Sequence, residues 1–242
     1  MQWSVRNMKI RVVLVGIEGS ANLGMIARTC VNFNIKELYL VNPLANIEEA
    51  IKYSAKGKEL LLNCKIVTSI EEAVKDVELS VATSSIGFRE GDVLRQAISI
   101  EDFVNKITPR TEKIAIIFGR ESSGLTRDEI EKADILVTIP ANPEYPVLNI
   151  AQSVAIFLWE MWKRINIQPA NIPTRAGKEE LEKITKIIEN ISRTVLSTDD
   201  KIRKILILWK RILARSTLSQ YEARLLEYWL RKIERRLFIK NK

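Results

Sequence analysis

The chain has 242 residues, 46% of them hydrophobic, which suits one large α/β domain or a domain of about 170 residues with a smaller one beside it. It has no histidine, which excludes serine–histidine triads and histidine-ligated zinc, and it lacks a signal-peptide pattern or an apolar run of roughly 18 residues, so a soluble cytoplasmic protein is expected. The net charge of +8 belongs to the C-terminal part: residues 175–242 hold 18 Lys and Arg against 9 Asp and Glu, or +9, which leaves residues 1–174 at −1.

The chain begins with a predicted strand, a glycine-bearing turn and a helix. Residues 10–15 form a β-branched apolar run typical of a strand covered on both faces, and Gly16 ends it. Asn22 is placed as a possible N-cap of the helix that follows. Arg28 falls about 140° from the apolar stripe of that helix on a helical wheel, so it is expected to point away from the core. The stripe consists of Leu23, Ile26, Ala27 and Cys30.

Strand and helix patterns continue to alternate along the chain. Residues 37–41, 65–68, 78–82 and 114–118 are predicted strands, and a second strand-like apolar run follows before Pro140. Helices are predicted at about 48–62, from Ser69, at 100–107 and just after Asn149. This order indicates a mostly parallel sheet with helices on both faces. Ligands of such sheets bind at the carboxyl ends of the strands. Ser20, Thr83, Gly119 and Pro140 are expected at those ends.

The C-terminal part predicts a separate helical domain. Prolines and a glycine mark residues 167–177 as a linker, which divides the chain into a domain at 1–166 and a basic helical domain at 178–242. Its excess of positive charge indicates a polyanionic partner, most simply nucleic acid; the alternative is a solvated face of no specific use. Ser197 and Ser219 have capping-box spacing. The expected apolar stripe of the third helix is Leu218, Leu225, Trp229, Ile233 and Leu237.

The first glycine-rich turn does not match a known nucleotide motif. GIEGSANLG has neither GxGxxG nor GxxxxGK[ST] spacing, so bound ATP or NAD is not expected. A turn of this kind can still present backbone N–H groups to a phosphate. Cys30 and Cys64 lack metal-ligand spacing and are expected to be small buried apolar residues, so no metal site is predicted.

Three segments together resemble one family. "SANLGMIARTCVNF", "IIFGRESSGLT" and "VTIPANPEYPVLNIAQSVAIFLWE" are similar to the ordered motifs of the SPOUT superfamily of S-adenosylmethionine-dependent RNA methyltransferases, in its TrmH/SpoU branch. The basic helical tail makes the chain most similar to the TrmJ subgroup. The resemblance covers roughly residues 8–165 and implies a tRNA ribose 2′-O-methyltransferase that acts on a pyrimidine of the anticodon loop, with cytidine 32 as the expected target.

The resemblance also implies a C-terminal trefoil knot in the sheet domain and a homodimer with the site at the subunit interface. One observation from the residues fits a dimer independently. The helix after Asn149 is apolar nearly all round, which a contact on one side would not require. The alternative is a helix buried within its own monomer.

Site residues carry over from the motifs. Arg28 is implied as the catalytic arginine, which binds the phosphate next to the target ribose and orients the 2′-hydroxyl, with Asn22, Glu121 and Asn149 completing the catalytic set. Their alternative readings are an N-cap for Asn22 and a solvated carboxylate for Glu121. The positions implied to bind S-adenosylmethionine are Thr83, Ser84, Ser85, Gly119, Ile139, Pro146, Val147 and Leu148.

The sequence departs from the family pattern in two places. Val147 stands where many relatives have serine, and Ile86-Gly87-Phe88 precedes Arg89 where arginines follow sooner in bacterial relatives. Two other functions therefore stay open. One is 2′-O-methylation of ribosomal RNA or of the tRNA D-loop, and the other is RNA binding by a protein that has lost catalysis.

Overall fold

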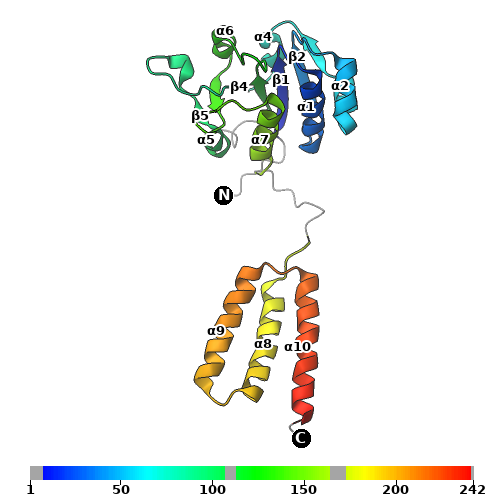
Figure 1. Ribbon diagram of the computed structural model, residues 1–242, viewed down its shortest axis with the longest axis vertical. Helices are drawn as coiled ribbons and strands as arrows, with labels where there is room; N and C mark the ends of the chain where they lie inside the picture. The colour runs from blue at the N-terminus through cyan, green and yellow to red at the C-terminus, as the bar shows by residue number, and fades with distance from the viewer. Residues whose placement is uncertain (1–7, 107–112, 164–172, 241–242) are drawn as a thin grey trace. The chain divides into compact units, whose positions relative to one another are not determined.

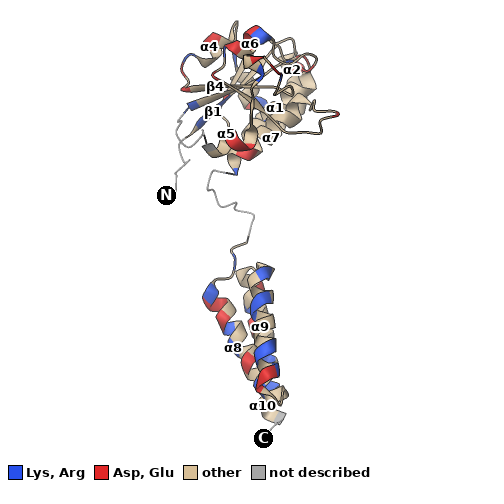
Figure 2. Cartoon of the chain, turned by 90° about the vertical axis from the view of Figure 1, so that its left-hand side faces the viewer, with Lys and Arg blue, Asp and Glu red and all other residues tan. Residues whose placement is uncertain are grey.

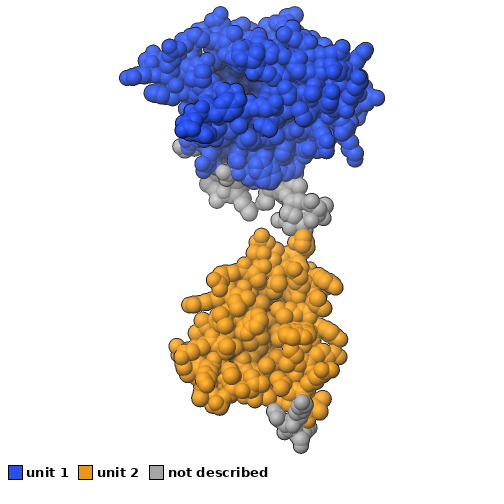
Figure 3. Space-filling model, viewed as in Figure 1, with its two compact units in different colours: residues 1–166 blue, residues 167–242 orange. Residues whose placement is uncertain are grey.

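The chain divides into two compact units, residues 1–166 and residues 167–242 (Figures 1 and 3). The computed structural model describes residues 8–106, 113–163 and 173–240. Residues 167–172 of the predicted linker and Ile107 of the helix predicted at 100–107 lie outside the described residues.

A seven-stranded sheet forms the centre of the first unit, in the order β3-β2-β1-β6-β4-β7-β5. Every strand pair in it is parallel, so the sheet is wholly rather than mostly parallel. The sequence does not predict β5 or α6, because both are too short to show a hydrophobic period. The strands are β1 (Lys9–Val15), β2 (Glu37–Val41), β3 (Lys65–Val67), β4 (Leu79–Thr83), β5 (Ile98–Ser99), β6 (Lys113–Phe118) and β7 (Ile135–Thr138).

Helices cover both faces of this sheet, as the sequence predicts (Figure 1). Successive strand residues point to opposite faces, so Val12 and Leu14 pack under α1, α5 and α7, whereas Val13 and Val15 pack under α4 and α6. The helices are α1 (Ser20–Asn32), α2 (Ile47–Ser54), α3 (Lys58–Leu62), α4 (Ile70–Val74), α5 (Ile100–Lys106), α6 (Arg127–Glu131) and α7 (Ile150–Trp162), with 3₁₀ turns η1 (Ala55–Gly57) and η2 (Val93–Arg95).

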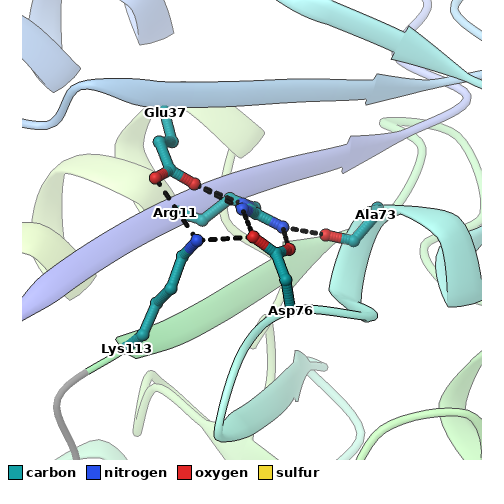
Figure 4. A network of polar contacts seen from close by, with 5 residues as sticks. All are labelled: Arg11, Glu37, Ala73, Asp76 and Lys113. Atoms are coloured by element: carbon teal, nitrogen blue, oxygen red, sulfur yellow. Dashed lines mark hydrogen bonds and ion pairs between the residues drawn. The ribbon is translucent and has the colours of Figure 1, made fainter.

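A closed polar network lies near the amino ends of the central strands (Figure 4). Arg11 of β1 is only 1% exposed, although it falls in an otherwise apolar run. Its guanidinium donates to Glu37 at 2.7 Å, to the carbonyl of Ala73 at 2.6 Å and to Asp76 at 2.6 Å. Lys113 Nζ lies 2.7 Å from Asp76. Each charge therefore has an opposite charge beside it, which is what burial of a guanidinium requires.

Residues 173–240 of the second unit form three helices: α8 (Lys178–Val195), α9 (Asp199–Ser216) and α10 (Gln220–Lys240). Helix α8 lies between the other two and packs against both (Figure 1), and Lys and Arg recur along them (Figure 2). Ile184, Ile188 and Leu213 belong to the small core.

The predicted details of this unit are right in part. Ser219 accepts from the amide of Glu222, as a cap should, whereas the predicted cap at Ser197 is wrong because α9 begins after Thr198. The stripe predicted for α10 is also wrong at Leu225 and Trp229, which are exposed. Ala223 and Leu230 are buried in their place.

Candidate active site

A cavity of about 280 Å³ opens at the carboxyl edge of the sheet, where β4, β6 and β7 end. The loops that follow these strands form its wall, together with the first turn of α7. Parallel strands bring such loops to one edge, which is why segments far apart in the sequence meet there. Thr83 and Gly119, two of the residues expected at strand ends, line this cavity.

All eight positions that the family motifs imply for the cofactor meet in this one cavity. The wall combines apolar side chains with hydroxyl groups and backbone of the two loops, so it can hold a flat apolar ring system and a polar chain together. The hydroxyl of Thr83 donates to the carbonyl of Ile117 at 2.9 Å, which fixes its direction. The eight positions are Thr83, Ser84, Ser85, Gly119, Ile139, Pro146, Val147 and Leu148.

The loop after β6 folds back on itself tightly. Arg120 and Gly124 exchange two backbone hydrogen bonds, at 2.9 and 3.2 Å. A Cβ atom added to Gly119 would lie 2.2 Å from the carbonyl carbon of Gly124, so no other residue fits at position 119 without moving the loop. Gly124 has φ +68°, a conformation that glycine adopts most readily. These two glycines let the loop backbone form the cavity wall.

Glu121 follows in the same loop and holds the turn before α1. Its carboxylate accepts hydrogen bonds from the amides of Glu18 and Gly19, at 2.9 and 3.0 Å, and from the side chain of Asn22 at 2.9 Å. Burial alone would raise the pKa of Glu121, but these hydrogen bonds outweigh it and the pKa is lowered. Glu121 is thus a partly buried, ionised acceptor, and the alternative of a solvated carboxylate is wrong.

The amide groups of Asn22 and Asn149 extend this cluster. Asn149 Nδ2 donates to Asn22 Oδ1 at 3.1 Å, while Asn149 Oδ1 accepts from the amides of Ala151 and Gln152 and so caps α7. Helix α1 begins at Ser20 after Gly19, so the alternative of Asn22 as its N-cap is wrong. The Asn22 amide instead links the loop after β6 to the start of α7.

Arg28 lies apart from this cluster within one chain. It is exposed on α1, as its position on the helical wheel predicts, and it does not line the cavity. The structure therefore brings together Glu121, Asn22 and Asn149 of the implied catalytic set but not Arg28.

Sequence reasoning missed Arg95 and Ser153, which also line the cavity. Arg95 donates to Ser84 Oγ at 2.7 Å, and no carboxylate pairs with it among the described residues. Arg120, the other guanidinium in the wall, is held by Glu129 at 2.9 Å. Arg95 follows a loop without periodicity, so only its spatial contact with Ser84 identifies it.

The described segments hold no cluster of three or more acidic or cysteine side chains arranged as metal ligands. Burial raises the pKa of the Cys30 thiol to about 12, and Cys64 is half-buried, so both are poor metal ligands at neutral pH. Among residues 8–106, 113–163 and 173–240, no helix has the length and apolar character needed to cross a membrane.

Residues 9–159 match the model of the SpoU rRNA Methylase family. The chain is 44% identical to the tRNA (cytidine-2'-O-)-methyltransferase TrmJ of Sulfolobus acidocaldarius over 95% of both chains. It is 36% identical to the TrmJ of Methanocaldococcus jannaschii over 88% of this chain and 95% of that one. The crystal structure of TrmJ from Z. mobilis superposes with a TM-score of 0.63 at 27% identity and covers 93% of this chain and 98% of that one.

Proposed function

The chain belongs to the SpoU rRNA methylase family, and we propose on that premise that it is an S-adenosylmethionine-dependent tRNA ribose 2′-O-methyltransferase that modifies a cytidine of the anticodon loop. The observation that carries the proposal is that all eight cofactor positions implied by the motifs line one cavity at the carboxyl edge of the sheet. The substrate class follows the near full-length TrmJ relatives. The expected nucleotide is cytidine 32.

The cavity wall suits the proposed cofactor. Ile139, Leu148 and Ile150 supply apolar contacts for an adenine ring, and the hydroxyls of Ser84 and Ser85 supply polar contacts for the amino-acid chain. Bound S-adenosylmethionine would supply an electrophilic methyl group for in-line displacement by the ribose oxygen. This chemistry needs positioning and help in removing one proton.

Arg28 would serve the acceptor. Guanidinium groups are poor proton acceptors, so the proposed role of Arg28 is to bind the phosphate next to the target ribose and stabilise the developing charge on the 2′-oxygen. Glu121 and Asn22 would act as positioning residues, because they fix the turn from which α1 starts and α1 carries Arg28. Asn149 would connect that turn to the cavity.

A homodimer would unite the two halves of the site. Met25 on α1 and Ile156 and Trp159 on α7 are exposed apolar residues, and these two helices pack against each other. A second copy that covered this face could bring its own Arg28 to the cavity. The single chain does not, so the proposed site is incomplete without the partner.

Mixing two inactive variants tests the shared site. Arg28→Ala removes the side chain that would bind the acceptor RNA. Val147→Trp should fill the cofactor cavity, and calorimetry would check that this variant no longer binds S-adenosylmethionine. After unfolding and refolding the two together, heterodimers hold one intact site, so about a quarter of the wild-type activity should return. If the mixture stays inactive although mixed dimers form, each site belongs to a single chain.

The second unit would bind tRNA outside the target nucleotide, with residues 167–177 as its linker. Its charge of +9 supports this role, since basic side chains displace counterions from phosphate. A tRNA substrate also implies a cytoplasmic location. For the first unit, the family implies a trefoil knot, and the convergence of the loops at 119–125 and 139–148 on one cavity is compatible with that path.

Incubation with labelled S-adenosylmethionine and unmodified tRNA, followed by nucleotide mapping, tests the activity. We expect label in 2′-O-methylcytidine of the anticodon loop. Label in the D-loop, or in ribosomal RNA offered in parallel, would move the substrate within the family. Tight tRNA binding without methyl transfer would support the alternative of an RNA-binding protein that has lost catalysis, which Val147 in place of the usual serine left open.

A further inference from the structure

The solvent side of α10 carries large aromatic side chains that its own unit does not cover. Tyr221, Tyr228 and Trp229 have exposed fractions of 76%, 60% and 57%. Their spacing along the helix puts them away from Ala223 and Leu230, which are buried in the core of the unit. Helix α10 therefore has two apolar sides, and only one of them packs against the rest of its unit.

The same side of α10 is positively charged. Lys232, Arg235 and Arg236 follow Tyr228 by four, seven and eight positions, which places them on one side of the helix. All three are exposed, and none has a carboxylate partner within the part of the chain that the structure describes. Lys232 Nζ lies 5.3 Å from the ring centroid of Tyr228, so a cation and an aromatic ring share one surface.

The carboxylates of α10 are engaged elsewhere. Glu222 accepts from the start of its own helix, Glu227 pairs with Arg231 at 2.7 Å, and Glu234 accepts from Asn190 of α8 at 2.7 Å. Each α10 carboxylate is therefore held by a partner within its own unit, and none of them is paired with Lys232, Arg235 or Arg236.

We infer that this surface binds unpaired nucleotides of the tRNA, with bases stacked on the rings and phosphates held by the cations; the inference rests on the proposed tRNA substrate. Unpaired bases offer faces for stacking, whereas bases within a duplex are already stacked. An apolar protein partner would instead have to bury three cations without counter-charges. The aromatic–basic face consists of Tyr221, Leu225, Tyr228, Trp229, Lys232, Arg235 and Arg236.

The aromatic part is tested in the full chain with the double variant Tyr228→Leu/Trp229→Leu. Leucine keeps apolar bulk and helix propensity but cannot stack. The probes are a hairpin RNA with an unpaired loop and a duplex of the same stem without a loop. We expect the affinity for the hairpin to fall about 10- to 100-fold, while that for the duplex changes less than about 3-fold. The single variant Trp229→Phe, which keeps an aromatic ring, should retain most of the wild-type affinity for the hairpin.

Two outcomes would overturn the inference. Equal loss on hairpin and duplex, or no loss on either, would mean that the rings do not stack on bases. A change in sedimentation of the RNA-free protein, with RNA affinity unaltered, would mean that a second copy or the first unit covers this face.

The charged part has a matched control. Arg235→Gln/Arg236→Gln and Arg193→Gln/Arg231→Gln each remove two exposed positive charges, but Arg193 and Arg231 are already paired with Glu189 and Glu227. The first pair should flatten the dependence of log affinity on log salt by about 1.5 units, and the control pair by much less. Equal slopes would show that only net charge matters.

The methyl-transfer assay separates this inference from the proposed function. If wild-type protein methylates tRNA but the leucine variant binds the hairpin normally, the α10 surface has another role and the enzyme assignment stands. If the wild type neither binds S-adenosylmethionine nor methylates RNA, the proposed function fails whatever the hairpin measurements show.

Discussion

At the amino end of the sheet, Arg11 is enclosed by Glu37, Asp76 and a carbonyl group. At the carboxyl end, by contrast, Glu121 lies beside an open cavity and accepts hydrogen bonds from two backbone amides and from Asn22. The pKa of a carboxylate is lowered at both ends. At the amino end the charges match one another, and none of these residues lines the cavity at the carboxyl edge. A shifted pKa alone therefore does not identify a binding site, and the adjoining cavity makes the difference.

The largest effect on cofactor binding should come from replacing a glycine in the loop after β6. In Gly119→Ala the new methyl group would lie 2.2 Å from the Gly124 carbonyl carbon, so the loop must move and S-adenosylmethionine binding should fall at least about 100-fold. In Gly124→Ala the added methyl group meets free space, but alanine at φ +68° costs about 1–2 kcal/mol. Its affinity for S-adenosylmethionine should therefore fall about 5- to 30-fold. Calorimetry measures both.

Gly177→Ala is the control for this series, because its Cβ would meet only a carboxylate oxygen of Glu180 at 3.7 Å. Its cofactor affinity should equal that of the wild type. Equal affinity in all three variants would contradict the role of the loop as the cavity wall.

Glu121→Gln should come next. In the wild type the amides of Glu18 and Gly19 donate to the two carboxylate oxygens of Glu121. Glutamine replaces one of these oxygens by an NH₂ group, which cannot accept, so the turn before α1 loses part of its support. A cost of about 2–3 kcal/mol lowers the methyl-transfer rate roughly 30- to 150-fold. Glu131→Gln, on the exposed end of α6, is the matched control and should transfer methyl groups at the wild-type rate. Equal rates in the two variants would remove Glu121 from the site.

Asp76→Asn should affect stability and leave transfer intact. Asp76 is half-exposed, so the loss should be about 1–2 kcal/mol, less than for a fully buried pair. Amide hydrogen exchange of β1 and β6 measures it within the first unit. Asp200→Asn, which breaks an exposed pair with Lys204 in α9, should cost less than about 0.5 kcal/mol. Loss of activity in folded Asp76→Asn protein would break the contrast between the two ends.

The stability that the Asp76 ion pairs contribute also depends on pH. Hydrogen bonds from Arg11 and Lys113 lower the pKa of Asp76 well below its usual range. A carboxyl group with a lowered folded-state pKa stabilises the protein above its unfolded-state pKa and loses that contribution as the pH falls through the folded-state value. The difference between wild type and Asp76→Asn should therefore be complete at neutral pH and shrink in strong acid. A difference that grew on acidification would contradict the ion-pair account.

The sequence predicts one end of the sheet better than the other. Periodic burial marks the strands, so local pattern predicts that Thr83 and Gly119 lie at the carboxyl edge, where both line the cavity. The other cofactor positions come from the resemblance to the family motifs. Arg11 stands in an apolar run, and its partners Glu37 and Asp76 lie 26 and 65 residues away, so nothing local indicates its burial. The pattern predicts Trp229 in the core, and it is exposed, because α10 carries apolar residues at helical spacing on both sides.

The central claim is that the carboxyl end holds the cofactor while Arg28 serves the acceptor from outside the cavity wall. Arg28→Ala tests it most directly, when S-adenosylmethionine affinity and methyl transfer to tRNA are measured on the same sample. We predict an affinity within about 3-fold of wild type and a transfer rate reduced at least about 1,000-fold, as for loss of a group that stabilises transition-state charge. Transfer at the wild-type rate would contradict the account.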